Sequence, residues 1–223
     1  MQKLDTPAPV TAVLDIAAGR IRFVAADRTD TTVEVLPADA SKGRDVKTAE
    51  RTEVTYADGV LRIETPASDN RILGSSGSIE VTVHLPAGSH VEAKAASAEF
   101  RTVGRLGDIV FAGGSHSVEI DEAASARLTV LDGDVSVVRL SGSAEISTQR
   151  GGIRIAEAVR GTVTLRTQQG DISVDAAGGV SASLDAGTTY GRISNALKNT
   201  DDGAPSLTIH ATTAHGDITA RSL

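Results

Sequence analysis

The sequence predicts an all-β protein: a right-handed parallel β-solenoid (β-helix) of short strands with coils of about 18 residues and an irregular N-terminal β region. One observation is a unit that recurs seven times between about residues 91 and 218, namely an apolar strand, a Gly-Asp-like turn and a second apolar strand. A second is the composition, because three Phe, two Tyr and no Trp among 223 residues predict a thin core of small and β-branched side chains. The third is the content of 22 Gly, which favours strands and turns.

Each unit contains an apolar marker residue directly after its turn. In the first five units an apolar residue of the first strand precedes the marker by seven positions, and in the last two the lead is nine, as an insertion of two residues at the turn would produce. A unit with two short strands cannot bury its own apolar face, so the copies before and after it must cover it. The markers are Phe100, Val118, Val135, Ile153, Ile172, Ile193 and Ile218.

Stacking these units at a strand spacing of about 4.8 Å predicts two interior columns. One column holds Val135, Ile153 and Ile172, and the facing column holds Leu128, Ile146 and Leu165. The positions between them are polar and point outward: Thr129, Ser136, Ser147, Arg154, Thr164, Ser173 and Thr208. Right-handed winding is the expected hand for parallel strands joined in this way. An antiparallel sandwich is the main structural alternative.

The chain is expected to divide into residues 1–90, an irregular N-terminal β region that continues or caps the solenoid, and residues 91–223, the solenoid repeats. Leu14 and Ile21 keep the seven-residue spacing, as do Val54 and Leu61, so part of this region could consist of irregular coils. Residues 53–64 also show a hairpin pattern around an Ala-Asp-Gly turn.

Three polar segments interrupt the strand pattern. Residues 38–52 lack a clear period and predict a surface excursion with room for a short helical turn. Residues 67–78 predict a loop, whose glycines lack the Lys and the following helix of a phosphate-binding loop. Residues 195–206 are expected to shield one side of the C-terminal end of the stack.

The corners between strands carry glycines and aspartates. Gly133, Gly152, Gly170, Gly191 and Gly216 precede the second strand, where a tight corner favours positive φ. Asp108, Asp134, Asp171 and Asp217 each follow a glycine, and such a column could in principle bind calcium or supply paired acids. Gly152 and Arg192 interrupt the column, so the sequence favours carboxylates that cap the corners by accepting bonds from backbone N–H groups.

No catalytic, cofactor-binding or metal-binding residues are assigned, and the protein is expected not to be an enzyme and to need no cofactor. The absence of cysteine excludes disulfides and Cys-based zinc sites. The sequence has no Gly-x-Ser-x-Gly elbow and too few aromatic residues for a row of rings. Tyr190 is expected to brace its turn. The histidines form no i, i+4 pair or ligand-like cluster: His84, His90, His116, His210 and His215.

The net charge of −7, without a basic run, argues against nucleic acid as a partner and against an anionic membrane surface. No apolar run approaches the roughly 18 residues of a spanning helix, so membrane insertion is not expected. The first ten residues lack the layout of a signal peptide, which predicts a cytoplasmic location. A mature chain whose leader had been removed would look the same.

Residues 4–10 (LDTPAPV), 19–35 (GRIRFVAADRTDTTVEV) and 79–89 (IEVTVHLPAGS), together with the recurring Gly-Asp-Ile, resemble a bacterial β-strand repeat family of unknown function labelled "putative adhesin". The resemblance covers nearly the whole chain, and the actinobacterial members look most similar. It implies the repeat fold, and it supplies no catalytic residues.

Three functions are compatible with these features. The first is a non-enzymatic, soluble β-solenoid that serves as a protein-interaction, adhesin-like or scaffold module for an unknown protein or surface partner. The alternative is a cytoplasmic, filament-forming protein resembling bactofilins, which would self-associate through its end coils. A β-helical carbohydrate-active enzyme is disfavoured by the missing aromatic residues and the lack of a clustered acid and base.

Overall fold

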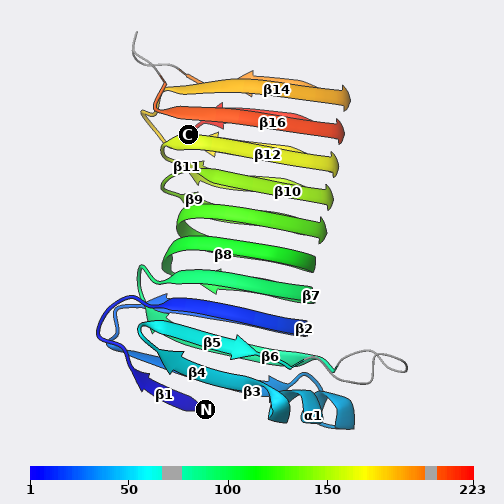
Figure 1. The fold of residues 1–223 in the computed structure, drawn as a ribbon. Coiled ribbons are helices and arrows are strands. Elements are labelled where there is room, and N and C mark those ends of the chain that lie inside the picture. Colours follow the sequence, from blue (N-terminus) through cyan, green and yellow to red (C-terminus); the bar gives the residue numbers. More distant parts are fainter. Residues whose placement is uncertain (67–76, 199–204) are drawn as a thin grey trace.

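A computed structural model describes residues 1–66, 77–198 and 205–223. Strands make up 72% of the structure and helix 4%, in an open sheet that does not close into a barrel, which confirms the predicted all-β class and is consistent with a solenoid-like fold. The strands stack along one axis, with β1 and α1 at one end and β14 at the other (Figure 1). The predicted loop and shield lie partly outside the described residues, at positions 67–76 and 199–204.

The described residues form seventeen strands and one helix. The N-terminal elements are β1 (Gln2–Asp5), β2 (Thr11–Ala26), β3 (Asp30–Pro37), α1 (Gly43–Arg51), β4 (Glu53–Ala57), β5 (Val60–Glu64) and β6 (Ile79–Pro86). The central elements are β7 (His90–Val103), β8 (Arg105–Asp132), β9 (Asp134–Leu140), β10 (Ala144–Arg150), β11 (Ile153–Ala158), β12 (Gly161–Gln169) and β13 (Ile172–Ala176). The last elements are β14 (Ala182–Tyr190), β15 (Ile193–Ala196), β16 (Leu207–His215) and β17 (Ile218–Ser222).

The centre of the stack consists of two parallel ladders. Ile146 of β10 lies between Leu128 and Leu165, its Cα partners on β8 and β12. Ile153 of β11 lies in the same way between Val135 and Ile172. All six side chains are at most 1% exposed, which confirms both predicted interior columns. The parallel pairing also excludes the antiparallel sandwich for this part of the chain.

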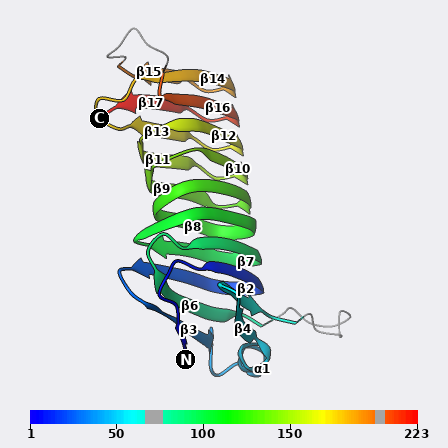
Figure 2. The same ribbon diagram turned by 60° about the vertical axis from the view of Figure 1, so that its left-hand side comes forward.

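The last coil does not stack in chain order, and the expectation of sequential stacking is wrong here. β16 pairs with β12 on one side and with β14 on the other, while β17 pairs with β13 and β15. The coil formed by β16 and β17 therefore lies between two coils that precede it in the sequence (Figures 1 and 2). The Arg221 guanidinium of β17 donates two 2.8 Å bonds to the Asp175 carboxylate of β13, whose side chain is 3% exposed, and so joins the two strands.

The N-terminal region joins the stack through β2. From Thr11 to Val24 β2 pairs in parallel with β7, and its other edge pairs with β5 and then β6. Beyond them the direction reverses, because β4 is antiparallel to β5, and β3 is antiparallel to both β6 and β1. The pair Val54 and Leu61 therefore belongs to a hairpin and not to a coil. Helix α1 occupies the predicted polar excursion. The division at residue 90 stays a prediction.

The corner glycines stack on one another. Gly133, Gly151, Gly170, Gly216 and Gly191 have φ between 132° and 156°, so the sequence-based choice of Gly152 was one residue off. A Cβ atom on Gly170 would overlap the carbonyl oxygen of Gly151 in the neighbouring coil. That oxygen also accepts a 3.0 Å bond from the Thr167 hydroxyl. The corner thus needs glycine for its backbone conformation and for the close approach of successive coils.

Candidate functional site

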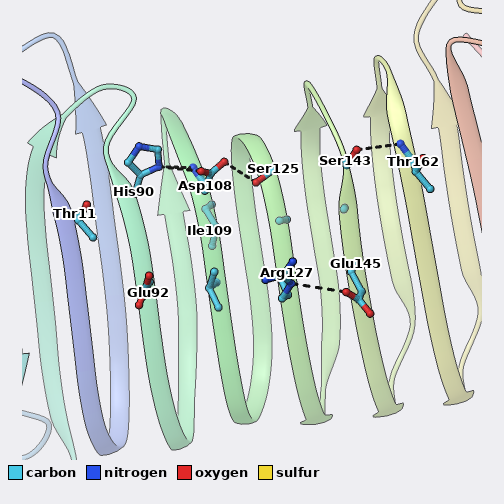
Figure 3. A pocket seen from close by; sticks show the side chains of 13 residues that line it. Thr11, His90, Glu92, Asp108, Ile109, Ser125, Arg127, Ser143, Glu145 and Thr162 are labelled. Atoms are coloured by element: carbon cyan, nitrogen blue, oxygen red, sulfur yellow. Dashed lines mark hydrogen bonds and ion pairs between the residues drawn. The ribbon is translucent and has the colours of Figure 1, made fainter.

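The candidate site is a polar groove of about 630 Å³ that crosses β2, β7, β8, β10 and β12 on their outward side (Figure 3). Two rows of outward side chains follow the groove from strand to strand. The residues between the rows point inward and are buried, as the alternation of a strand requires. The first row holds His90, Asp108, Ser125, Ser143 and Thr162, and the second holds Glu92, Val110, Arg127 and Glu145.

The first row contains a network of three side chains centred on Asp108. The Ser125 hydroxyl donates a 2.6 Å bond to the Asp108 carboxylate, and His90 Nδ1 lies 3.4 Å from the other oxygen of that carboxylate. His90 Nδ1 also accepts a 3.0 Å bond from the Asp108 backbone N–H. Since the carboxylate stands between the serine and the imidazole, His90 is not placed to take the Ser125 proton. The network joins the starts of three successive coils.

The second row carries charges that are only loosely paired. The Arg127 and Glu145 side chains are 3.8 Å apart, and Arg166 lies 3.9 Å from the other Glu145 oxygen. More than half of each of these side chains is exposed. Such surface pairs contribute roughly 0–1 kcal/mol, so a ligand can recruit these charges at little cost.

Three of the four corner aspartates play the capping role that the sequence predicted, whereas the Asp108 carboxylate accepts its bond from the Ser125 side chain. The Asp134 carboxylate accepts a 2.7 Å bond from the Gly152 N–H, the Asp171 carboxylate accepts one of 2.7 Å from the Asp217 N–H, and the Asp217 carboxylate accepts one of 2.8 Å from the Arg192 N–H. Gly152 and Arg192, which interrupt the acidic column, are donors to it. The Arg192 N–H, and then its guanidinium, hold the pKa of Asp217 below its ordinary value.

The remaining histidines lie apart from the groove network. His210 Nδ1 is 3.3 Å from an Asp185 oxygen, and the His215 ring stacks on Tyr190 with centroids 5.0 Å apart. His84 lies in β6 and His116 in β8. Across residues 1–66, 77–198 and 205–223, no three His, Asp or Glu side chains are grouped to hold a metal ion.

Sequence reasoning singled out His90 and Asp108 but did not bring them together, and it did not select Ser125. The signal was present in their spacing, since His90, Asp108 and Ser125 follow one another at intervals of 18 and 17 residues, close to the marker interval. Neighbours at one coil length occupy the same outward column. Within the described part of the chain, no helix is both long and apolar enough to cross a membrane.

The fold and the groove define a class of protein: a stacked, solenoid-like β protein with polar outward columns. The chain belongs to the Toastrack family (DUF4097), a domain family of unknown function whose sequence profile matches residues 105–221, just over half of the chain. No curated protein matches the sequence.

Several solved bacterial structures are similar to this chain over nearly their whole length. A Bacteroides fragilis protein described as a "putative adhesin" has a TM-score of 0.57 at 14% identity, over 98% of this chain and 95% of the other. A Parabacteroides distasonis protein with the same description has a TM-score of 0.46 at 15% identity, over 100% and 95%. Another, described as a "putative lipid binding protein", has a TM-score of 0.48 at 11% identity, over 98% and 95%. At these identities the likeness concerns the fold alone.

Proposed function

We propose that this protein is a non-enzymatic, adhesin-like or scaffold module that binds a protein or surface partner through the polar groove. The observation that carries the proposal is the second row of the groove, where Arg127 and Glu145 are largely exposed and held on consecutive strands of one parallel ladder. The proposal includes a cytoplasmic location, no cofactor and no nucleic acid partner.

The ladder gives these side chains a fixed spacing. The strands β8, β10 and β12 are each bonded on both sides, and the residues beneath the groove are buried. A partner that binds here therefore orders few groups of this chain, which lowers the entropic cost of association. Charged and hydroxyl groups in alternation favour a partner with complementary polar groups over an apolar one.

The Asp108 network supports a binding function over a hydrolytic one. The Ser125 hydroxyl donates its hydrogen bond to the Asp108 carboxylate, and the His90 imidazole contacts that same carboxylate. A carboxylate in this position stabilises neither an alkoxide nor a developing oxyanion. The B. fragilis structure agrees with the proposal only through its fold and its description.

Finer features of the fold belong to the same proposal. We take the winding to be right-handed with coils of about 18 residues, because parallel strands joined by short corners favour that hand. We take the chain to be actinobacterial-like, as the resemblance of its sequence motifs implies.

Charge reversal on one face tests the proposal. Arg166→Glu changes the groove face, where Arg166 lies near Glu145, and Arg154→Glu changes an outward column on the other ladder. Pull-downs from native lysate, read by quantitative mass spectrometry, should show partners that bind wild type and Arg154→Glu but are lost with Arg166→Glu. Circular dichroism of each variant controls for folding. The proposal is contradicted if every partner is still captured after the charges of each outward column have been reversed in turn.

A further inference from the structure

The C-terminal end of the stack leaves an interior column uncovered. Ile193 continues the column of Ile172 and Ile218, which are each 1% exposed, yet Ile193 itself is 47% exposed. All four residues of β15 are exposed. Leu184 of β14 likewise continues the buried column of Val163 and Ile209 and is only partly covered. The last coil therefore presents its apolar interior at the end of the stack.

The backbone at this end is also open. Among the described strands, β14 pairs only with β16, and β15 pairs only with β17. Soluble proteins protect such edges with lysines, prolines, bulges or inward charges. Residues 184–190 and 193–196 contain one charged residue, Asp185, and no Lys or Pro. This edge lacks the devices that prevent pairing with another strand.

The N-terminal end of the stack is closed. Ile79, Val81 and Val83 of β6 are at most 1% exposed, because the antiparallel strand β3 pairs with β6 and helix α1 packs nearby. Head-to-tail stacking would need an open parallel coil at both ends. Of the two ends of this chain, only a second C-terminal end thus offers an open coil to match the first.

We propose that β14 and β15 pair, through their outer edges, with the same edges of a second copy of this chain around a two-fold axis, which closes the assembly as a dimer. Charge complementarity selects the direction of pairing. Asp185 lies in the first half of β14 and Arg192 just beyond its end, so antiparallel pairing brings each Asp185 toward the partner's Arg192. Parallel pairing would place like charges together. A two-fold contact of this kind leaves no free end for a filament.

Sedimentation of the full chain between about 1 µM and about 1 mM tests the dimer. One coil end buries less area than the roughly 800 Å² per partner of a standard interface. We therefore expect a weak dimer whose population rises with protein concentration. The dimer is expected to be the largest species. Ile193→Lys should remain monomeric throughout this range. The matched control is Val138→Lys, because Val138 is 53% exposed on the outward side of β9, away from the end, and this variant should dimerise as wild type.

A charge exchange tests the direction of pairing. Asp185→Arg and Arg192→Asp should each raise the dimer dissociation constant about tenfold, and the double variant should recover most of the loss. Equal weakening in the double variant would overturn the antiparallel arrangement. The intramolecular partners of these residues, His210 and Asp217, make melting temperatures of all three variants a necessary control.

Three results would overturn the proposal: a wild-type chain that is monomeric at every concentration, an Ile193→Lys variant that is folded and still dimeric, or species larger than the dimer. The groove lies on the outward face and not at the end of the stack. A variant that loses the dimer but still captures partners therefore tests this proposal alone. A variant that loses its partners but still dimerises tests the proposed function alone.

Discussion

At the N-terminal end of the stack, β3 runs antiparallel to β6 and leaves the β6 interior row buried, whereas at the C-terminal end β15 leaves Ile193 nearly half exposed. Both ends consist of strands with apolar residues at interior positions. The difference lies in chain direction, because a reversed strand and a helix cannot be extended by another coil. A repeating parallel coil has no feature of its own that prevents another coil from stacking on it.

The largest expected contrast comes from the corner glycines. Gly19→Ala should destabilise the whole protein by more than about 3 kcal/mol, since Gly19 has φ 145° and a Cβ atom there would overlap the carbonyl oxygen of Ile79. Gly191→Ala creates the same overlap with Gly216, but only the last coil depends on it, so about 1–2 kcal/mol is expected. Urea unfolding measures both.

Gly59→Ala is the control for these two variants, because Gly59 has φ 77° and no atom near the added methyl group. It should cost only the backbone strain, about 1–2 kcal/mol. Equal losses in Gly19→Ala and Gly191→Ala would show that the two ends are coupled to the core to the same degree.

Arg221→Met should cost about 3 kcal/mol, because it leaves the nearly buried Asp175 carboxylate with only Arg154, 3.8 Å away. The change should release β16 and β17, and with them the end coil, while β6 and β7 stay folded. Arg101→Met is the matched control, since Arg101 pairs with Glu119 at 3.5 Å on an exposed surface and should cost less than about 1 kcal/mol. Similar losses in urea unfolding would refute the special role of Arg221.

Hydrogen exchange should separate the two ends without any substitution. Amides of β14 and β15 are expected to exchange at least about tenfold faster than those of β6, because the last coil is bonded on one side and packed on one side. Peptide-resolved mass spectrometry at low protein concentration, where the proposed dimer is absent, gives the comparison. Equal protection of β6, β14 and β15 would show that the last coil is as stable as the closed N-terminal end.

The smallest expected effect is a dependence on acid. The pKa of Asp217 is held below its ordinary value by Arg192, and that of Asp30 by Arg28, so each contributes stability above the ordinary carboxyl pKa of 3.8 that is lost as pH falls through the lowered value. Asp217→Asn should speed exchange in β15 at pH 7, and wild type and variant should converge as the pH falls below the lowered pKa of Asp217. Asp30→Asn should act on β1 alone. A difference that persists in acid would contradict this account.

The central columns could be predicted because each central coil buries one apolar residue on its first strand and another, seven positions later, on its second strand. The corner caps could be predicted because an aspartate follows the corner glycine in several coils. The order of the last two coils could not, since Ile193 and Ile218 fit the same column equally well. The contact between Asp175 and Arg221 joins the inserted coil to β13, and these residues are 46 positions apart, too far for a local pattern to reveal. The hairpin of residues 53–64 resembled a coil in the sequence because Val54 on its first strand and Leu61 on its second are seven positions apart.

The groove was predictable only in part. Outward residues show no apolar periodicity in the sequence. The proximity of His90, Asp108 and Ser125 can be predicted only by looking for polar residues that are one coil length apart. Uncovered end coils are a general expectation for a solenoid, but the exposure of Ile193 could not be predicted, because Ile193 has the sequence environment of a buried residue. It is exposed because no described coil stacks beyond β15.

The placement of β16 and β17 between earlier coils has a consequence for biosynthesis. A chain that emerges from the ribosome in order can stack its coils as they appear, up to β13. The slot next to β13 must then stay vacant, or be held by β14 and β15, until residues 207–222 have also been synthesised. The order of the last two coils is therefore settled only after β14 and β15 have emerged, and a nonsense mutation just before β16 would leave β14 and β15 free to occupy the slot next to β13.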